Sequence, residues 1–152
     1  MVRIPLVFSG DQIVLVCAIE CKSLRIHKRL ARFIIDTGSI NSFLSTKDVI
    51  SLQVPVSGVK ADDQVDFGGS RFDRVELPKF NIYVFKEDKN SNEYITLKIK
   101  ISALRSNKKS KEKIQIAESL PSILGMDFLK EQRLALYVNP AEKISYMEKA
   151  IS

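Results

Sequence analysis

The residues best suited to chemistry follow a short apolar run in the first third of the chain. Residues 33–35, Phe-Ile-Ile, have no polar break and are typical of a buried strand, and Asp36-Thr37-Gly38-Ser39 comes directly after them. A carboxylate at the end of a strand can exchange a proton with a substrate, bind a metal ion, or accept hydrogen bonds from the turn that follows it. Other features of the sequence are needed to distinguish between these uses.

Three interpretations of Asp36 are open at this point. In the first, Asp36 only closes an Asx-type turn, in which Gly38 supplies a backbone geometry that other residues resist. In the second, the motif is the D-x-G-[ST] of RNase H-like nucleases or of actin-like phosphate-binding folds. The nucleases need further carboxylates at the ends of strands or helices, in a chain where strands and helices alternate. The actin-like folds need a much longer chain. In the third, Asp36 is one of two catalytic carboxylates.

Sulfur and imidazole ligands for a metal ion are scarce. The chain contains one histidine, His27, and two cysteines, Cys17 and Cys21. A tetrahedral metal site needs more ligands than these residues offer, so we expect no metal and no cofactor. Strand alternation places both cysteines on one face, which favours reduced structural thiols, and His27 is interpreted as a surface turn residue.

A second motif begins about 85 residues after Asp36. Residues 121–129 read PSILGMDFL, and the apolar run 134–138 follows them. With DTGS at this separation, ILGMDFL resembles the pattern of the retropepsin-like aspartic proteases, which pair apolar-Asp-Thr/Ser-Gly with a later apolar-apolar-Gly strand and a short helix. The resemblance extends over roughly residues 13–147.

The resemblance implies a fold and an activity. The fold is all-β, the closed half-barrel of the acid proteases with one or two short helices, formed by residues 1–152 as a single domain. Because the chain has one DTG motif, the second carboxylate must come from another copy. We therefore expect a homodimeric aspartic endopeptidase that acts on a peptide or protein substrate, with two Asp36 carboxylates sharing one proton.

The same resemblance implies roles for the neighbours of Asp36. Thr37 would bond across the dimer beneath the two carboxylates, and Gly38 would offer its backbone N–H and allow close approach. Ser39 would hydrogen-bond the outer oxygen of Asp36. Support from below would come from three residues of the second motif, Ile123, Leu124 and Gly125.

Segment 56–77 matches the flap hairpin that covers the substrate in these enzymes. Its Gly68-Gly69 pair resembles the glycine-rich end of a retroviral flap. We expect the tip near residues 60–63, Lys-Ala-Asp-Asp, a charged sequence where retroviral flaps present glycine and apolar side chains. Substrate contacts are expected from the flap and the pocket, at Ile40, Asp66, Phe67, Gly68, Gly69 and Ile123.

The elements that position these residues are mostly strands. Four segments are rich in β-branched and aromatic residues or alternate with period two, and are predicted strands: 14–21, 30–36, 78–88 and 94–102. Two short helices are predicted, one over 45–52 with Ser45 as its N-cap and one over 125–132, where Asp127 lies early and suits the helix dipole.

The formal net charge of +6 is concentrated in two segments. Residues 22–32 contribute +5 and residues 105–113 contribute +4. Neither segment interleaves aromatic side chains with its charges, as single-strand binding platforms do, so we interpret both as solvated loops, 105–113 as a flexible one. Nucleic acid is the less favoured partner. The alternative function is an inert dimeric binding or scaffold module of the same fold, contacting nucleic acid through these loops.

The overall composition is that of a folded soluble protein, with 45% hydrophobic and 28% charged residues. No stretch of about 18 apolar residues suggests a membrane span. The apolar N-terminal segment is interrupted by Ser9-Gly10-Asp11 and lacks the form of a signal peptide. We expect no membrane partner and a cytoplasmic location.

Overall fold

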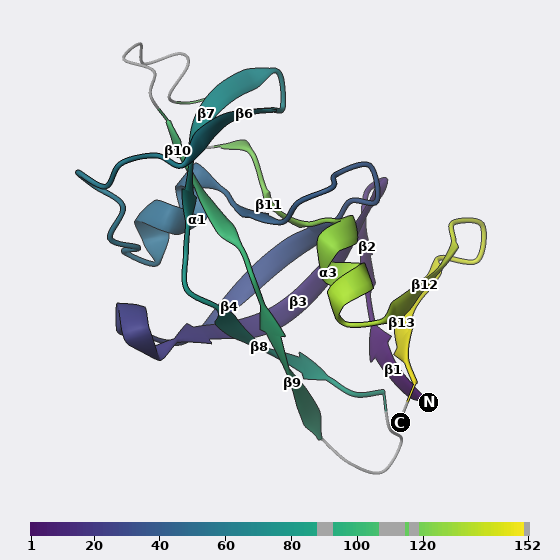
Figure 1. The fold of residues 1–152 in the computed structure, drawn as a ribbon. Helices are drawn as coiled ribbons and strands as arrows, with labels where there is room; N and C mark the ends of the chain where they lie inside the picture. Colours follow the sequence, from purple (N-terminus) through teal and green to yellow (C-terminus); the bar gives the residue numbers. More distant parts are fainter. Residues whose placement is uncertain (88–92, 107–114, 116–118, 151–152) are drawn as a thin grey trace.

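The computed structural model describes residues 1–87, 93–106, 115 and 119–150. Strands dominate this part of the chain, and the two α-helices within it have six residues each. The predicted all-β fold with one or two short helices is confirmed (Figure 1).

Most strands lie in one large sheet. Its order among the described residues is β6-β7-β10-β5-β11-β4-β3-β8-β9, with β2 on β3. The bounds are β2 Val7–Ser9, β3 Gln12–Cys21, β4 Ile26–Ile35, β5 Phe43–Leu44, β6 Asp63–Phe67, β7 Ser70–Glu76, β8 Phe80–Phe85, β9 Tyr94–Ile99, β10 Ser102–Ser106 and β11 Ser122–Leu124.

A smaller sheet joins the two ends of the chain. Strands β1 (Val2–Pro5), β13 (Ile144–Lys149) and β12 (Leu134–Asn139) are antiparallel in that order, and Val2 is paired with Lys149. Figure 1 shows this sheet on one side of the molecule, with the N- and C-terminal ends next to each other.

The large sheet does not close into the expected half-barrel. Its strand pairing in the described part of the chain runs as an open path from β6 to β9. The two end strands lie at opposite ends of the molecule in Figure 1, because the β6–β7 hairpin projects away from the rest of the sheet. The fold is therefore all-β but open at these two edges.

The first basic segment is a hairpin, not a solvated loop. Residues Lys22–Leu24 form the 3-10 helix η1, Arg25 has a φ of 57°, and β4 already begins at Ile26. His27 is therefore an exposed strand residue, not a turn residue. The cause is backbone pairing: β4 pairs with β3 along its length, with one register shift between Ile19 and Cys21, and this pairing satisfies its backbone groups while the charged side chains remain in water.

The second basic segment lies mostly outside the described residues, since residues 107–114 are not among them. Its first two residues, Arg105 and Ser106, belong to β10 and not to a loop. The Arg105 guanidinium donates to the carbonyl oxygens of Val56 and Val59 at 2.7 and 2.5 Å and pairs with Asp73 at 3.3 Å. Arg105 is therefore a cation that fixes a neighbouring chain segment.

Both helices begin where the sequence indicated. Helix α1 spans Thr46–Ser51, and the backbone N–H of Asp48 donates to the Ser45 hydroxyl at 3.2 Å, so Ser45 is its N-cap. Helix α3 spans Met126–Glu131 and buries Phe128 and Leu129. Each helix covers apolar surface of the neighbouring strands.

The core consists of two groups of buried side chains. The larger one lies between the strands and both helices, and the smaller one consists of Phe43, Phe72, Leu104 and Ile123. Cys17 and Cys21 are buried free thiols, as predicted, and burial raises the pKa of Cys17 to about 12. Among the described residues no helix is both long and apolar enough to span a membrane.

Candidate active site

The predicted site loop starts at the end of β4 and is held by β11. Leu124 is paired in parallel with Ile35, and the next backbone N–H, that of Asp36, donates to the Leu124 carbonyl oxygen at 3.0 Å. Because a strand that pairs on both sides has little freedom at its end, Asp36 leaves the sheet in a fixed direction. The strand that supplies this support comes from the second sequence motif.

The Asp36 carboxylate also closes the turn that follows it. Its Oδ1 accepts a hydrogen bond from the Gly38 N–H at 2.9 Å, and its carbonyl oxygen accepts one from the Ser39 N–H at 3.1 Å. This is the Asx-type turn of the first interpretation. It occupies one carboxylate oxygen and leaves the other without a hydrogen-bond partner among the described residues.

The side chains beside Asp36 differ in exposure and in contacts. Asp36 is half-buried, whereas Thr37 and Gly38 are exposed. The expected hydrogen bond from Ser39 to the outer oxygen of Asp36 is not formed: the Ser39 hydroxyl donates to the carbonyl oxygen of Asn41 at 2.7 Å. The correction has a simple cause, since the turn directs the Ser39 hydroxyl along the loop and not back toward Asp36.

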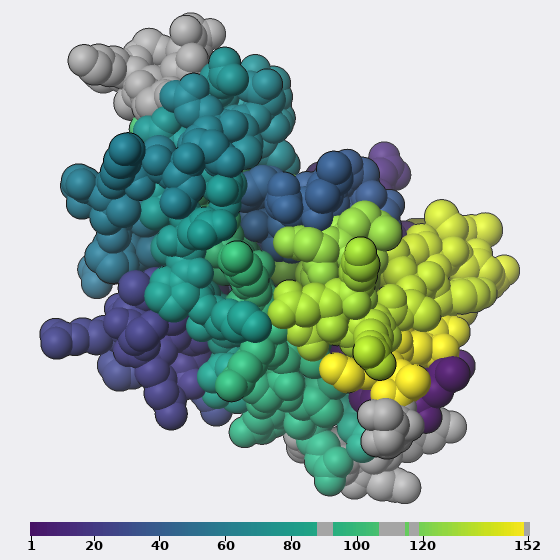
Figure 2. All heavy atoms as spheres, viewed as in Figure 1, coloured from purple at the N-terminus to yellow at the C-terminus, as the bar shows by residue number. Residues whose placement is uncertain are grey.

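The loop rests on the start of helix α3, as Figure 2 shows for the blue loop and the green helix. The backbone N–H groups of Met126 and Asp127 donate to the carbonyl oxygens of Ser39 and Ile40 at 2.8 and 3.0 Å. The first N–H groups of a helix have no partner within the helix, and here the loop carbonyls provide one.

Gly125 lies where the loop and helix meet. A Cβ at this position would be 2.5 Å from the carbonyl oxygens of both Ser39 and Asn41. Its φ of −98° is open to any residue, so the requirement for glycine is steric. Gly125, Ile123 and Leu124, the three residues expected to support the loop, are all buried.

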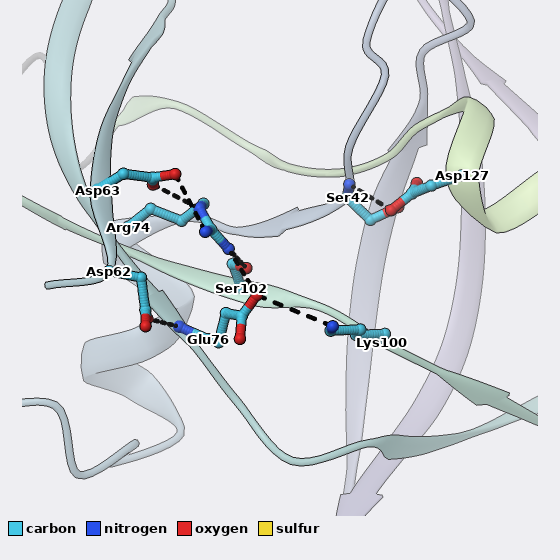
Figure 3. A network of polar contacts seen from close by, with 8 residues as sticks. All are labelled: Ser42, Asp62, Asp63, Arg74, Glu76, Lys100, Ser102 and Asp127. Carbon is cyan, nitrogen blue, oxygen red and sulfur yellow. Dashed lines mark hydrogen bonds and ion pairs between the residues drawn. The ribbon is translucent and has the colours of Figure 1, made fainter.

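A partly buried polar contact completes the attachment of the loop to α3 (Figure 3). Asp127 accepts from the Ser42 hydroxyl at 2.7 Å and from its N–H at 3.2 Å, and the Ser42 hydroxyl accepts from the Gly125 N–H at 2.9 Å. Sequence reasoning assigned Asp127 to the helix dipole and did not find Ser42. The sequence signal that could have pointed to Ser42 is its position directly before the apolar pair Phe43 and Leu44.

A similar contact lies at the other end of β11. The Ser122 hydroxyl donates to Asp48 of α1 at 2.5 Å and accepts from the Ser45 N–H at 2.8 Å. Both Ser45 and Ser122 are buried. Strand β11 is thus fixed to a helix at each end, and the loop above it has a rigid floor.

The predicted flap is a hairpin, but its tip lies elsewhere than expected. Strands β6 and β7 are paired from Asp63–Arg74 to Phe67–Ser70, so the turn is formed by Gly68 and Gly69 and not by residues 60–63. Both glycines have positive φ, 57° and 79°, which explains why this pair marks the turn. The charged residues 60–63 lead into the base of the hairpin.

The hairpin tip packs on the smaller apolar core group. The Phe67 ring lies 6.2 Å from that of Phe43 and 6.4 Å from that of Phe72, between ring centroids. Phe67 thereby joins the group that contains Ile123, so two of the predicted substrate-contact residues share one apolar cluster. A Cβ on Gly68 would meet the Leu120 side chain at 2.5 Å, so Leu120 lies directly against the turn.

Two other predicted contact residues are not part of this cluster. Asp66 is exposed and lies 3.9 Å from Arg71 on the hairpin. The Ile40 side chain is 77% exposed at the loop above α3. The structure therefore brings residues 36–39 together with 123–125, and Phe67 together with Ile123, but leaves Ile40 and Asp66 in solvent.

Polar contacts fix the base of the hairpin (Figure 3). The Arg74 guanidinium donates twice to Asp63, at 2.6 and 3.1 Å, and once each to Glu76 and Ser102, at 3.3 and 3.0 Å. These bonds hold the pKa of Asp63 below its usual value, chiefly through the hydrogen bonds from Arg74. Ser102 belongs to β10, so the hairpin is attached to the central sheet.

Lys100 and Asp62 extend this group of contacts. The Glu76 carboxylate lies 3.8 Å from the Lys100 ammonium, and the Glu76 N–H donates to Asp62 at 2.7 Å.

Within the part of the chain that the structure describes, no three histidine, cysteine or acidic side chains are grouped as a metal site.

Comparison with solved structures places the fold among known ones. The crystal structure of a retropepsin-like aspartic protease from Rickettsia conorii is similar with a TM-score of 0.53 and 13% identity, covering 95% of this chain and 88% of that chain. The retroviral protease-like domain of Ddi1 from Leishmania major gives a TM-score of 0.38 and 13% identity, covering 91% and 94%.

The first of these similarities confirms, at the level of the fold, the resemblance that the DTGS and ILGMDFL motifs indicated. The chain has the fold of the retropepsin-like aspartic proteases. No protein-family model and no curated protein sequence matches the chain.

Proposed function

We propose that this chain is an aspartic endopeptidase that works as a homodimer, with one Asp36 carboxylate from each copy. The observation that carries the proposal is the position of Asp36. It follows the buried end of β4 in a retropepsin-like fold, its N–H is bound to Leu124, and its loop is held on Gly125. An Asx turn by itself needs none of this support.

In the proposed reaction the two carboxylates share one proton, because like charges at close range do not both ionise. The ionised carboxylate takes a proton from a water molecule while the water oxygen attacks the peptide carbonyl carbon. The protonated carboxylate donates its proton to the carbonyl oxygen. The carbon–nitrogen bond then breaks as the carboxyl group that took the proton from water gives it to the amine nitrogen, and the other carboxylate takes a proton from a hydroxyl of the tetrahedral intermediate, which gives one carboxylic acid and one amine.

The contacts within one copy suit this division of labour. The Gly38 N–H holds Oδ1 of Asp36 and so fixes the plane of the carboxylate. The second oxygen has no partner among the described residues and is available to water or to the other carboxylate. Thr37 is exposed beside it and is available to the partner copy. A single copy has only half of the proposed pair.

Exposed apolar side chains next to the loop support the proposed dimer. Ile40 is 77% exposed and Met126 is 45% exposed, and both belong to the region where the loop meets α3. Large apolar side chains grouped near one site favour burial against another surface. A second copy placed with its Asp36 next to this one would cover them.

The hairpin offers a place for a substrate side chain. Phe67 at its tip packs on the same apolar cluster as Ile123. If the Phe67 ring moved away, an apolar side chain of the peptide could occupy its place and keep water out of the cluster. We therefore propose that peptide binding requires the tip to lift from Phe43 and Leu120, and that apolar residues are preferred next to the cleaved bond.

The test is cleavage of a mixed-peptide library from pH 3 to 7 over a dilution series of the protein. We expect a rate that rises with about the square of protein concentration at the dilute end, since two copies form one site. Asp36→Asn should abolish cleavage and leave the fold and dimer intact. Asp11→Asn, which neutralises an exposed carboxylate in a turn, is the matched control and should retain activity.

Two outcomes would contradict the proposal. Cleavage that persists in Asp36→Asn would remove the carboxylate mechanism. Absence of cleavage by the unaltered protein, in a preparation shown to be folded and dimeric, would favour the inert binding module of the same fold.

A further inference from the structure

The outer face of four neighbouring strands carries a group of side chains that the proposed peptidase site does not use. Strands β4, β3, β8 and β9 are adjacent, and alternate residues on each point away from the core. The register puts Leu30, Ala18, Tyr83 and Thr96 in one row across the strands. We call this surface the outer sheet face, and its residues are Lys28, Leu30, Arg32, Val16, Ala18, Glu20, Asn81, Tyr83, Phe85, Tyr94, Thr96 and Lys98.

Aromatic rings lie at the centre and at one edge of the outer sheet face. Phe85 is 59% exposed and Tyr94 is 53% exposed, and these two residues are directly paired across β8 and β9. The ring of Tyr94 meets that of Tyr83 edge-on, with 5.7 Å between centroids. Exposed rings on a flat sheet are surfaces on which nucleobases can stack.

Cations lie between and beside these rings. The Lys28 ammonium is 4.1 Å from the centroid of Tyr83 and 5.4 Å from that of Tyr94. Arg32 and Lys98 lie further out on the same face. Sequence reasoning found no aromatic residues among the charges of 22–32, but the fold brings them in from β8 and β9. The interleaving of rings and charges therefore exists across strands and not along the chain.

The cations outnumber the acids here. Five of them, Lys22, Lys28, Arg32, Lys47 and Lys98, lie on the face or line its ends, and none has an ion pair with a described carboxylate. The acids are Glu20 and Asp48, and each already accepts a hydrogen bond, from the Tyr83 hydroxyl at 2.8 Å and from Ser122. The surface is therefore suited to an anionic partner.

Each end of the face is hollowed. A cavity of about 570 Å³ is lined by Val16, Leu30, Arg32 and Lys47, and one of about 260 Å³ is lined by Glu20, Lys22, Asn81 and Lys98. The ring of Tyr83 lies in the row between them, and that of Tyr94 lies beside it on the edge strand β9. A linear anion with flat apolar groups would contact both hollows and the rings.

We propose that the outer sheet face binds single-stranded nucleic acid. Bases would stack on Phe85 and Tyr94, and phosphates would pair with Lys28 and Arg32. A second copy of this chain fits less well, because a twofold contact through this face would bring like charges together. An acidic peptide would satisfy the cations but would not use the stacking surfaces. The proposal is independent of the peptidase activity.

The test is fluorescence anisotropy of labelled oligouridine and oligothymidine of about 12 nucleotides, which lies within the range that single-strand binding domains cover. We expect dissociation constants of about 1 to 100 µM at physiological salt for the unaltered protein. Phe85→Ala and Tyr94→Ala should each weaken binding about tenfold. In Lys28→Ala with Arg32→Ala, the slope of log K against log salt should fall by about 0.7 for each cation removed.

Matched controls carry the same changes on other surfaces. Tyr137→Ala alters an exposed ring on β12, and Lys60→Ala with Lys130→Ala removes two exposed cations. These variants should bind as the unaltered protein does. Because all the altered side chains are exposed, we expect every variant to fold, and thermal unfolding should show this before the binding constants are compared.

Three results would overturn the proposal. One is no oligonucleotide binding by the folded protein. Another is equal binding of an oligoglutamate peptide, which would show that charge alone attracts the ligand. The third is self-association of the protein that disappears in Phe85→Ala, which would identify the face as a contact between copies.

Discussion

The carboxylate of Asp127 accepts hydrogen bonds from both the hydroxyl and the backbone N–H of Ser42, which lies 85 residues earlier in the chain. Ser42 is 2% exposed, and its hydroxyl also accepts from the Gly125 N–H. One side chain therefore joins the Asp36 loop, the residue beneath it and helix α3. The loop is positioned by this contact as much as by the strands.

Ser42→Ala should destabilise the protein by about 1 to 3 kcal/mol, because the buried Gly125 N–H loses its acceptor and Asp127 loses a donor. The free energy of unfolding in urea measures this loss. Ser57→Ala, at an exposed turn, is the control and should change stability by less than about 0.5 kcal/mol. Equal stability of the two variants would show that the contact carries little weight.

Gly125→Ala should disturb the loop directly. The added methyl group would overlap two backbone oxygens, and neither can move without shifting the loop, so we expect a loss of about 1 to 3 kcal/mol together with loss of peptidase activity. The control is Gly10→Ala, where φ is 60° and a Cβ meets nothing within 4 Å. That variant should also lose stability, through backbone strain, but should keep its activity. Activity in Gly125→Ala would contradict the supporting role.

Phe67→Ala should release the hairpin tip. The ring contributes apolar contact with Phe43 and Phe72, so its removal should lower the free energy of hairpin opening by about 1 to 3 kcal/mol. Amide hydrogen exchange at Val65 and Phe72 reports this opening and should become at least about fivefold faster. Arg71→Ala, on the exposed side of the same hairpin, should leave the exchange rates unchanged. Unchanged rates in Phe67→Ala would mean that the rings do not hold the tip.

The base of the hairpin should respond to acid. Asp63 has a pKa lowered in the folded protein by hydrogen bonds from Arg74, so its contribution is present above the unfolded value of 3.8 and is lost as the pH falls through the lower folded value. Between about pH 5 and about pH 2.5, the unaltered protein should therefore lose more stability than Asp63→Asn does. Urea unfolding at several pH values measures the difference.

The carboxylate Asp66, also on this hairpin, is the comparison for that experiment. It is exposed and lies 3.9 Å from Arg71, so Asp66→Asn should have the same acid dependence as the unaltered protein. If the free energy of unfolding depends on pH in the same way for Asp63→Asn and for the unaltered protein, the contact with Arg74 does not depend on the ionisation of Asp63.

The strand content and both helices could be predicted because their signals are local. Alternation in 94–102 and the cap at Ser45 depend on residues within one turn or one strand of each other. Gly68 and Gly69 were a predicted turn, but the tip of the hairpin was expected near the charged residues 60–63, although paired glycines between two strand-forming segments are the stronger turn signal. The polar residues 60–63 do not by themselves form a tight turn, whereas Gly68 and Gly69 can adopt the positive φ values that the turn between β6 and β7 requires.

The contacts that hold the site could not be predicted, because they join distant segments. Nothing near Ser42 indicates a carboxylate at Asp127, and nothing near Arg105 indicates the carbonyl oxygens of Val56 and Val59. Residues 22–29 have the composition of a loop, and only the pairing with β3 extends the predicted strand 30–36 back to residue 26. Side chains of Tyr83 and Lys28 become neighbours through the same pairing.

The place of β11 in the sheet has a consequence for the protein while it is being synthesised. This strand lies between β4 and β5, yet Ser122 to Leu124 are made long after both. A growing chain that has already produced Asp36 therefore has neither the floor of the loop nor Gly125 and Asp127. Contacts of such large sequence separation form slowly. The proposed proteolytic activity would thus be absent from the nascent chain until residues 122–127 have left the ribosome.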